Sequence, residues 1–229
     1  MRGDEEPVFA KRISIFTGHF GSGKTEIAVN YACGLAERYE KTAIVDFDIV
    51  NPFFRTADAK EELEKRGIKV ILPLYANTNV DVPALTGEIN MLFERKEFRA
   101  VFDVGGDDLG ARAVSRYKQD ILQDEYEMFF VVNINRPMTD TIEKIIEMFR
   151  EIEESSRLKI TSIVNNTNLL EYTSAKDIID GHKLILEASE KLAVPVSFIS
   201  GLRPEVEIAG KALGTDYLAL TKLIKLPWQ

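Results

Sequence analysis

The sequence predicts an α/β fold in which a mostly parallel β-sheet carries helices on both faces. Short runs that are apolar throughout alternate along the chain with longer segments whose apolar residues recur at helical spacing. Strands of a parallel sheet have this uninterrupted apolar pattern, because helical crossovers cover the sheet above and below. Polar clusters follow most of the apolar runs. Since parallel sheets bind ligands at the carboxyl ends of their strands, a functional site is expected at these clusters.

The first half of the chain begins with the short apolar run Ile13–Phe16, which predicts a strand. A glycine-rich loop follows, and the apolar-rich segment from Ile27 to Ala36 then predicts a helix. Further strands are expected at 42–45, 68–72 and 100–102, and helices at 56–66 and 83–96. Gly67 stands where the helix 56–66 must end, since glycine readily adopts the left-handed conformation that closes a helix. The region from Tyr75 to Gly87 is polar and loop-like.

The second half continues the alternation with longer elements. Helices are expected at 110–123, 139–154 and 174–192, and strands at 128–134, 160–164 and 196–199. One or two short helices are expected after the last of these strands. No Pro-, Gly- or Ser-rich linker and no internal repeat interrupts the alternation, so residues 1–229 are expected to form a single domain.

Composition narrows the class of protein. With 45% hydrophobic and 29% charged residues, the chain is typical of a globular protein. Its net charge of −8 disfavours a nucleic-acid partner, because binding to a phosphate backbone depends on clustered Lys and Arg. The single cysteine, Cys33, excludes a disulfide within the chain. Met1–Pro7 has no apolar signal core and no long apolar run follows, so a cytoplasmic protein that does not bind membranes is expected.

The segment Gly18–Thr25 fits the phosphate-loop pattern G-x-x-x-x-G-K-[ST] at every fixed position, between a predicted strand and a predicted helix. Glycines let the backbone curl so that successive N–H groups converge on phosphate oxygens, and the helix start adds its positive dipole end. The whole loop is therefore predicted to bind a nucleotide through Gly18, His19, Phe20, Gly21, Ser22, Gly23, Lys24 and Thr25. Lys24 is expected to act catalytically at the β- and γ-phosphates, and the Thr25 hydroxyl to bind Mg²⁺.

Two groups of aspartates at strand ends predict the metal and water chemistry. Asp103 follows an apolar strand and would hold Mg²⁺ through water, while the N–H of Gly106 would sense the γ-phosphate. Asp46 and Asp48 lie two residues apart, so extended backbone points both to the same side. We expect Asp46 to help hold the metal and Asp48 to orient or deprotonate the attacking water. Solvated carboxylates that start turns are the alternative.

The run Asn165-Asn166-Thr167-Asn168 is similar to the base-recognition signature N-K-x-D, with Asn in place of the final Asp. A carboxylate accepts two donors from guanine, whereas an amide both donates and accepts, which suits adenine. Asn165 and Asn166 are therefore predicted to bind the nucleotide, and ATP is favoured over GTP. An Asn-rich turn without a ligand is the alternative.

Together these motifs resemble the CobQ/CobB/MinD/ParA nucleotide-binding group of the SIMIBI phosphate-loop NTPases over most of the chain. Val45–Ile49 resembles the Asp-x-Asp switch I of MinD-type ATPases, in which the second Asp is catalytic, and Asp103–Gly106 resembles their switch II. The segment Gly201–Glu205 resembles the one whose Pro and acidic residue flank adenine in that group. The resemblance thus implies that Arg203, Pro204 and Glu205 bind the base, with ATP and Mg²⁺ as cofactors.

The chain departs from that family pattern at His19. MinD and ParA proteins carry a lysine there that crosses to the nucleotide of the partner subunit in a homodimer. Histidine holds no permanent charge near pH 7, so Arg55 and Arg112, close to the two switches, are candidate substitutes. The terminal run 218–228 invites comparison with the membrane-targeting tail of MinD, but its two lysines and Pro227 favour packing against the core.

Two classes of enzyme fit these residues, and both are carried forward. The first is an Mg²⁺-dependent ATPase that switches the segments after Asp46 and Asp103 and so changes its affinity for a protein partner. The second is a small-molecule kinase or an ATP-dependent carboxylate-activating ligase of the CobB or dethiobiotin-synthetase type. In that second class a small-molecule acceptor would contact the polar loop through Asn77, Thr78, Asn79 and Asp81. A nucleotide-binding module without turnover is a third reading.

Overall fold

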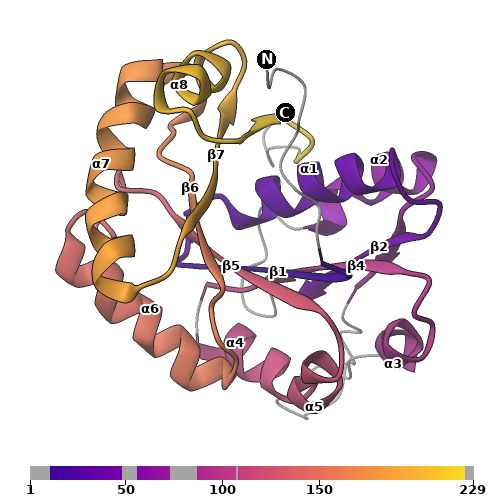
Figure 1. Cartoon of the computed structure of the whole chain (residues 1–229). Coiled ribbons are helices and arrows are strands. Elements are labelled where there is room, and N and C mark those ends of the chain that lie inside the picture. The colour runs from indigo at the N-terminus through magenta and orange to yellow at the C-terminus, as the bar shows by residue number, and fades with distance from the viewer. Residues whose placement is uncertain (1–10, 48–55, 73–86, 107, 225–229) are drawn as a thin grey trace.

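The computed structural model describes residues 11–47, 56–72, 87–106 and 108–224 (Figure 1). Eight parallel strands form one sheet in the order β3-β2-β4-β1-β5-β6-β7-β8. The strands are β1 (Ile13–Thr17), β2 (Thr42–Phe47), β3 (Lys69–Ile71), β4 (Arg99–Val104), β5 (Tyr126–Val132), β6 (Ser162–Asn165), β7 (Val196–Leu202) and β8 (Tyr217–Leu220). The helices are α1 (Lys24–Ala36), α2 (Lys60–Lys65), α3 (Gly87–Glu94), α4 (Asp108–Ser115), α5 (Lys118–Leu122), α6 (Ile142–Ser156), α7 (Ala175–Leu192) and α8 (Glu205–Leu213). Short 3₁₀ turns occupy Thr56–Ala59 and Leu170–Tyr172.

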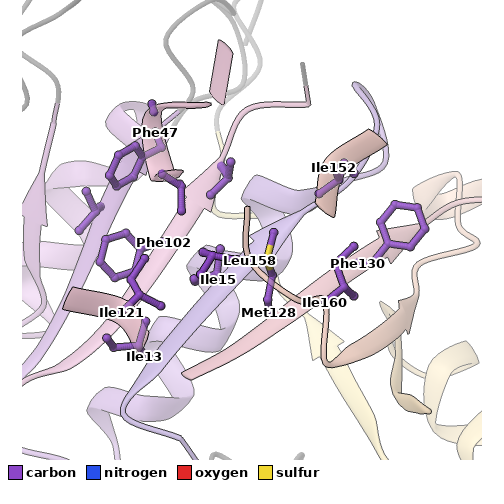
Figure 2. Close-up of a cluster of buried hydrophobic side chains, with 14 of the residues drawn as sticks. Ile13, Ile15, Phe47, Phe102, Ile121, Met128, Phe130, Ile152, Leu158 and Ile160 are labelled. Atoms are coloured by element: carbon purple, nitrogen blue, oxygen red, sulfur yellow. The ribbon is translucent and has the colours of Figure 1, made fainter. Parts of the chain in front are cut away.

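Helices cover both faces of the sheet, which confirms the predicted fold class (Figure 1). On one face α1 and α2 pack over an aromatic cluster in which the rings of Phe16 and Phe129 stack at 4.8 Å. On the other face α3, α4, α5, α6 and part of α7 cover the strands. Figure 2 shows this second core, which includes Ile15 and Met128 of the sheet and Ile152 of α6. Helix α8 packs beside α7 over β7 and β8.

The order of the strands creates a crevice beside β1. The chain leaves β1 into α1 on one face of the sheet, whereas it leaves the adjacent β4 into α4 on the other face. Where neighbouring strands send their connections to opposite faces, the loops diverge at the carboxyl ends and leave room for a ligand. The phosphate loop follows β1 and the Asp103 segment ends β4, so both border this crevice.

Two elements differ from the sequence prediction. The expected helix 110–123 is two helices, α4 and α5, which are separated at Arg116–Tyr117. The expected helical end of the chain is wrong beyond α8, because Tyr217–Leu220 forms β8 and pairs in parallel with β7. Leu218, Leu220 and Ile224 are buried against the α1 side of the sheet, in agreement with core packing of the described part of the run 218–228; residues 225–228 lie outside the described residues. In the part of the chain that the structure describes, no helix is long and apolar enough to cross a membrane.

Candidate functional site

The loop between β1 and α1 has the backbone geometry of a phosphate cradle. Gly18, Gly21 and Gly23 have φ angles of 145°, 75° and 89°, which disfavour residues with a side chain. A Cβ atom at Gly18 would lie 2.4 Å from the carbonyl oxygen of Val131, and one at Gly23 would lie 2.2 Å from Nδ2 of Asn166. The loop is thus packed against the ends of β5 and β6, and glycine is sterically required at both positions.

Polar groups of the phosphate loop bond to one another within the loop. The ammonium group of Lys24, whose residue is only 6% exposed, donates to the carbonyl oxygen of His19 at 3.1 Å. The backbone N–H of Ser22 donates to the same oxygen at 3.1 Å. The Ser22 hydroxyl is buried and has no hydrogen-bond partner among the described residues, so it is a donor that a phosphate oxygen could satisfy. Thr25, half-buried on the first turn of α1, lines the cleft described below.

Two carboxylates lie side by side at the edge of this cradle. Asp46 of β2 and Asp103 of β4 are register partners, and both are fully buried. The Thr56 hydroxyl donates to Oδ2 of Asp103 at 2.9 Å. Carboxylate and hydroxyl oxygens are ligands that suit Mg²⁺, which commonly takes one or two carboxylates and completes its shell with water and phosphate. The donor set of Thr25, Asp46 and Asp103 therefore fits the predicted metal, whereas Asp48 lies outside the described residues.

Gly106 lies directly on the backbone of the phosphate loop. A Cβ atom there would be 2.4 Å from the backbone nitrogen of Phe20 and 2.8 Å from the carbonyl carbon of His19. Such a close approach is possible only for glycine. The segment that follows Asp103 is thus in contact with the loop, as the predicted role of Gly106 requires.

The asparagine run at the end of β6 contacts the phosphate loop through Asn166. Asn166 is buried; its Nδ2 donates to the carbonyl oxygen of Ser22 at 2.6 Å, and its Oδ1 accepts from the Ser200 hydroxyl and from Asn168. The Nδ2 of Asn165 donates to the carbonyl oxygen of Ile178, and its Oδ1 accepts the N–H of Thr167. Both side chains are therefore engaged within the protein. Asn168 lines the cleft beside Asn166, and its Oδ1 accepts the backbone N–H of Leu170 at 3.0 Å.

A cleft of about 1240 Å³ opens above the loop. The phosphate loop and α1 form its floor, and the segment 166–172 forms one wall with the apolar side chains of Leu169, Leu170 and Tyr172. Leu220, Lys222, Leu223 and Ile224 approach it from the end of the described chain. An apolar wall beside a phosphate cradle can hold a nucleotide base next to its phosphates.

The residues predicted to flank adenine line an adjoining cavity. Arg203, Pro204 and Glu205 line a separate cavity of about 250 Å³, which shares Leu170 with the main cleft. Oε2 of Glu205 accepts the backbone N–H of Ala175 at 2.6 Å, so this carboxylate caps the start of α7. The structure therefore places Asn166 against the phosphate loop and puts Asp103 in register with Phe16, just before that loop. Asp46 and Asp103 are not among the residues that line the main cleft, and the 203–205 segment lies beside it.

Arg136 is a residue of the site that the sequence analysis missed. Its Nε donates to the carbonyl oxygen of Gly21 at 2.8 Å, and it lines the cleft. Its only signal in the sequence is its place in the polar run that follows β5. Of the two arginines that were named instead, Arg112 is exposed on α4 and does not line the cleft, and Arg55 lies outside the described residues.

The surroundings of His19 favour its neutral form. Burial lowers the pKa of His19, and the positive charges of Lys24 and Arg136 lower it further, although a hydrogen bond with the backbone of Phe20 opposes them. Position 19 thus contributes an uncharged ring at pH 7.

Comparisons with known proteins agree with this geometry. A family model described as "CobQ/CobB/MinD/ParA nucleotide binding domain" matches residues 13–185. The comparison with curated proteins found no match. The similar solved structures include the cell division protein FtsY of Thermotoga maritima, with a TM-score of 0.58 and 17% identity over 90% of this chain and 67% of that one. They also include the signal recognition particle 54 kDa protein of Aeropyrum pernix in complex with GDP, with a TM-score of 0.54 and 18% identity over 93% of this chain. This chain spans 49% of that protein, and at such low identity the likeness concerns the fold.

Proposed function

This chain belongs to the CobQ/CobB/MinD/ParA nucleotide-binding domain family, and we propose that it is a cytoplasmic, Mg²⁺-dependent ATPase whose nucleotide state controls its affinity for a protein partner. The observation that carries the proposal is the contact of Gly106 with the backbone of His19 and Phe20. Because no side chain fits between these segments, a phosphate that rearranges the loop must also displace the segment after Asp103. Binding and loss of the γ-phosphate would thereby become a movement that a partner can recognise.

The chain's own residues would divide the chemistry among them. Lys24, which now donates to a loop carbonyl, would transfer its hydrogen bonds to the β- and γ-phosphates. Thr25, Asp46 and Asp103 would hold Mg²⁺, which neutralises phosphate charge when bound. Asp48 would orient or deprotonate the water that attacks the γ-phosphate.

The base would lie against the apolar wall formed by Leu169, Leu170 and Tyr172. Asn166 would act beneath the nucleotide by holding the loop, and Asn165 would support it by fixing the start of the Asn run. Arg203, Pro204 and Glu205 would contact the edge of the base from the adjoining cavity. The amide of Asn168 in place of a carboxylate supports ATP over GTP. The 54 kDa relative was solved with GDP, so a test must include both nucleotides.

The size of the cleft favours a second candidate, a small-molecule kinase or a carboxylate-activating ligase. Its volume of about 1240 Å³ exceeds the roughly 300–1,000 Å³ of most sites that hold one small ligand, which leaves room for an acceptor. The acceptor contacts expected at Asn77, Thr78, Asn79 and Asp81 lie outside the described residues.

Phosphate release from ATP and from GTP with Mg²⁺ tests both candidates. The rate is measured at several protein concentrations, with and without a panel of small carboxylates and alcohols. The expected result is a slow rate per subunit that is unaffected by the panel compounds and increases with protein concentration. That result would also support a homodimer. A rate per subunit that increases with one panel compound and does not depend on protein concentration would favour the kinase or ligase over the switch.

The Asp48→Asn variant then examines the hydrolytic step. We expect it to bind ATP normally and to lose turnover by about 10²-fold or more, because a carboxylate that positions the attacking water is removed. Unchanged hydrolysis by this variant would exclude Asp48 from the mechanism. Absence of hydrolysis of either nucleotide by the unmodified protein, with ATP still bound, would leave a binding module instead of an enzyme.

A further inference from the structure

Arg136 reaches the phosphate loop from a distant part of the chain. It lies between β5 and α6, 115 residues beyond Gly21, whose carbonyl oxygen accepts a hydrogen bond from its Nε at 2.8 Å. The guanidinium lies next to Gly21, since a Cβ built there would be 3.4 Å from the same Nε. Among the described residues, the Arg136 side chain makes one hydrogen bond, the one to Gly21.

Hydrogen bonds within the β5–α6 connection hold Arg136 in place. The buried carbonyl oxygen of Asn133 accepts both the Thr139 hydroxyl at 2.7 Å and the backbone N–H of Arg136 at 3.1 Å. The Asn133 side chain accepts the N–H of Asn135 and donates to the carbonyl oxygen of Asn168. The connection is thus fixed to both its own turn and the Asn run, so the backbone that carries Arg136 is held in place before a ligand binds, which lowers the entropic cost of binding.

A triphosphate at the phosphate loop needs positive charge beside it. A triphosphate carries several negative charges, and position 19 supplies a neutral ring. Guanidinium is always charged, and its planar fork forms paired hydrogen bonds with phosphate oxygens. With Nε on the Gly21 carbonyl, the two Nη groups remain to face a ligand in the cleft that Arg136 lines.

We propose that Arg136 is a phosphate-binding residue that supplies, from the same chain, a second permanent positive charge at the loop beside that of Lys24. The inference rests on the proposed nucleotide site and adds the source of its charge. It also implies that a single subunit can hold the triphosphate without a cation from a partner.

Three variants separate a charge role from a bracing role. Arg136→Gln keeps a donor for the Gly21 carbonyl but removes the charge, whereas Arg136→Lys keeps the charge and removes the fork. Lys144→Gln is the matched control, because it removes one positive charge from the start of α6 at a side chain that bonds to Pro137 and Asp140 and does not line the cleft. The dissociation constant of ATP with Mg²⁺ and the melting temperature of the nucleotide-free protein are measured for each.

For Arg136→Gln we expect ATP binding to weaken roughly 10- to 100-fold, the loss typical of one charge-assisted hydrogen-bonded contact, with the melting temperature unchanged. Arg136→Lys should recover most of the affinity, and Lys144→Gln should match the unmodified protein. Equal binding by Arg136→Gln and the unmodified protein would overturn the inference alone. Weaker ATP binding by Arg136→Lys than by Arg136→Gln, together with a lower melting temperature for Arg136→Lys, would also overturn it, because Arg136 would then only brace the loop. An unmodified protein that binds no nucleotide would overturn the proposed function as well.

Discussion

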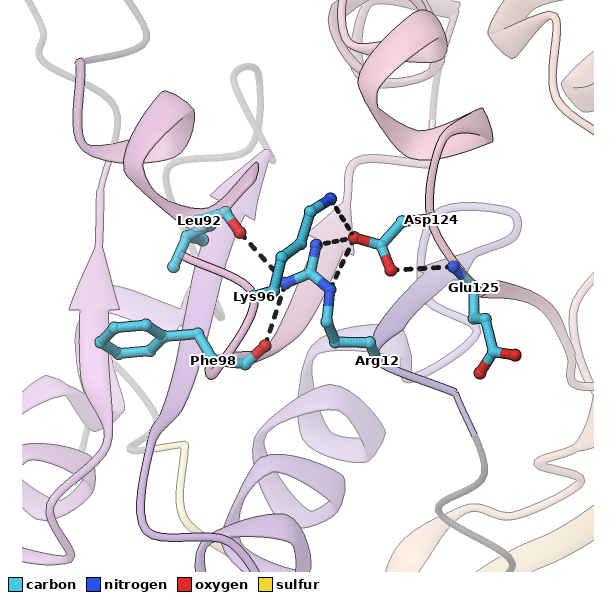
Figure 3. A network of polar contacts seen from close by, with 6 residues as sticks. All are labelled: Arg12, Leu92, Lys96, Phe98, Asp124 and Glu125. Carbon is cyan, nitrogen blue, oxygen red and sulfur yellow. Dashed lines mark hydrogen bonds and ion pairs between the residues drawn. The ribbon is translucent and has the colours of Figure 1, made fainter. Parts of the chain in front are cut away.

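Arg12 and Asp124 form a buried ion pair at the amino ends of β1 and β5, at the opposite edge of the sheet from the cleft (Figure 3). The guanidinium also donates to the carbonyl oxygens of Leu92 and Phe98, each at 3.0 Å, and Lys96 donates to Asp124 at 2.6 Å. The Arg12 side chain therefore joins α3, the α3–β4 connection and the α5–β5 connection. Its charge is almost fully removed from water, because Arg12 is 8% exposed.

Replacing Asp124 with Asn should lower the free energy of unfolding by about 3 kcal/mol, because the buried guanidinium loses its counter-charge. The measurement is a urea unfolding curve at pH 7. Glu125→Gln is the matched control: its side chain is 71% exposed, and its weak pair with Lys11 at 3.9 Å predicts a change within about 0.5 kcal/mol. Equal stability of the two variants would contradict a structural role for the pair.

The same carboxylate predicts an acid-sensitive stability. Burial alone would raise the pKa of Asp124, but the hydrogen bonds from Arg12 and Lys96 outweigh burial and lower its pKa from 3.8 to about 2. Since the pKa is lower in the folded state, the stabilising contribution is present above pH 3.8 and is lost as the pH falls towards about 2. The urea midpoint of the unmodified protein should therefore fall more steeply across this interval than that of Asp124→Asn. Parallel curves would refute this assignment.

Gly106 provides a further prediction at the residue scale. Gly106→Ala should weaken ATP binding by at least roughly tenfold, because its methyl group would displace the loop backbone at His19 and Phe20. Gly87→Ala is the control, since a Cβ there meets nothing within 4 Å. Calorimetric titration with ATP and Mg²⁺ measures both. Wild-type affinity in Gly106→Ala would show that the two segments are not in contact in the nucleotide-free protein.

At the scale of elements, α1 is connected to the end of the described chain. Asn30 donates to the carbonyl oxygen of Thr221 at 3.0 Å and accepts its N–H at 2.8 Å, while Glu26 accepts the N–H of Leu223 at 2.9 Å. Residues 221–224, which we call the C-terminal strap, therefore lie along the helix that begins with Lys24 and Thr25. Lys222 of the strap lines the cleft and also pairs with Glu171, which lines the adjoining smaller cavity.

Asn30→Ala should release the strap, because two backbone hydrogen bonds of about 1 kcal/mol each are lost. We expect hydrogen exchange of the Thr221 and Leu223 amides to accelerate by roughly tenfold or more, and ATP affinity to fall as the cleft loses that wall. Asn90→Ala makes the same change at an exposed site on α3 and should affect neither quantity. Unaltered exchange at Thr221 in Asn30→Ala would mean that other contacts hold the strap.

The elements that sequence reasoning placed well are those whose pattern is local. The glycine loop and the apolar central strands carry their structure in adjacent residues, so their positions were predicted correctly. β8 was missed because Tyr217–Leu220 is short and contains Leu and Ala, which favour helices, and its pairing with β7 decides its conformation. The break at Arg116–Tyr117 was missed because no Pro or Gly occurs there to indicate the end of a helix.

At the scale of the whole molecule, the sheet order explains which site residues could be predicted. Asp46, Asp103 and the loop each end a strand, and parallel strands bring their carboxyl ends to one edge. The contact of Arg136 with Gly21 depends instead on how the β5–α6 connection folds back over β1, which no local pattern encodes. The 203–205 segment also ends a strand, but β7 lies three strands from β1, so it borders a neighbouring cavity.

The central claim is that the cleft above the loop holds a nucleoside triphosphate, and equilibrium binding of ATP with Mg²⁺ tests it most directly. The unmodified protein should bind, and Lys24→Ala should lose at least roughly tenfold in affinity, because a buried charged donor is removed from the cradle. Lys60→Ala, at an exposed position of α2 that does not line the cleft, should bind as the unmodified protein does. Equal affinity of Lys24→Ala and the unmodified protein, or no binding by either, would contradict the account.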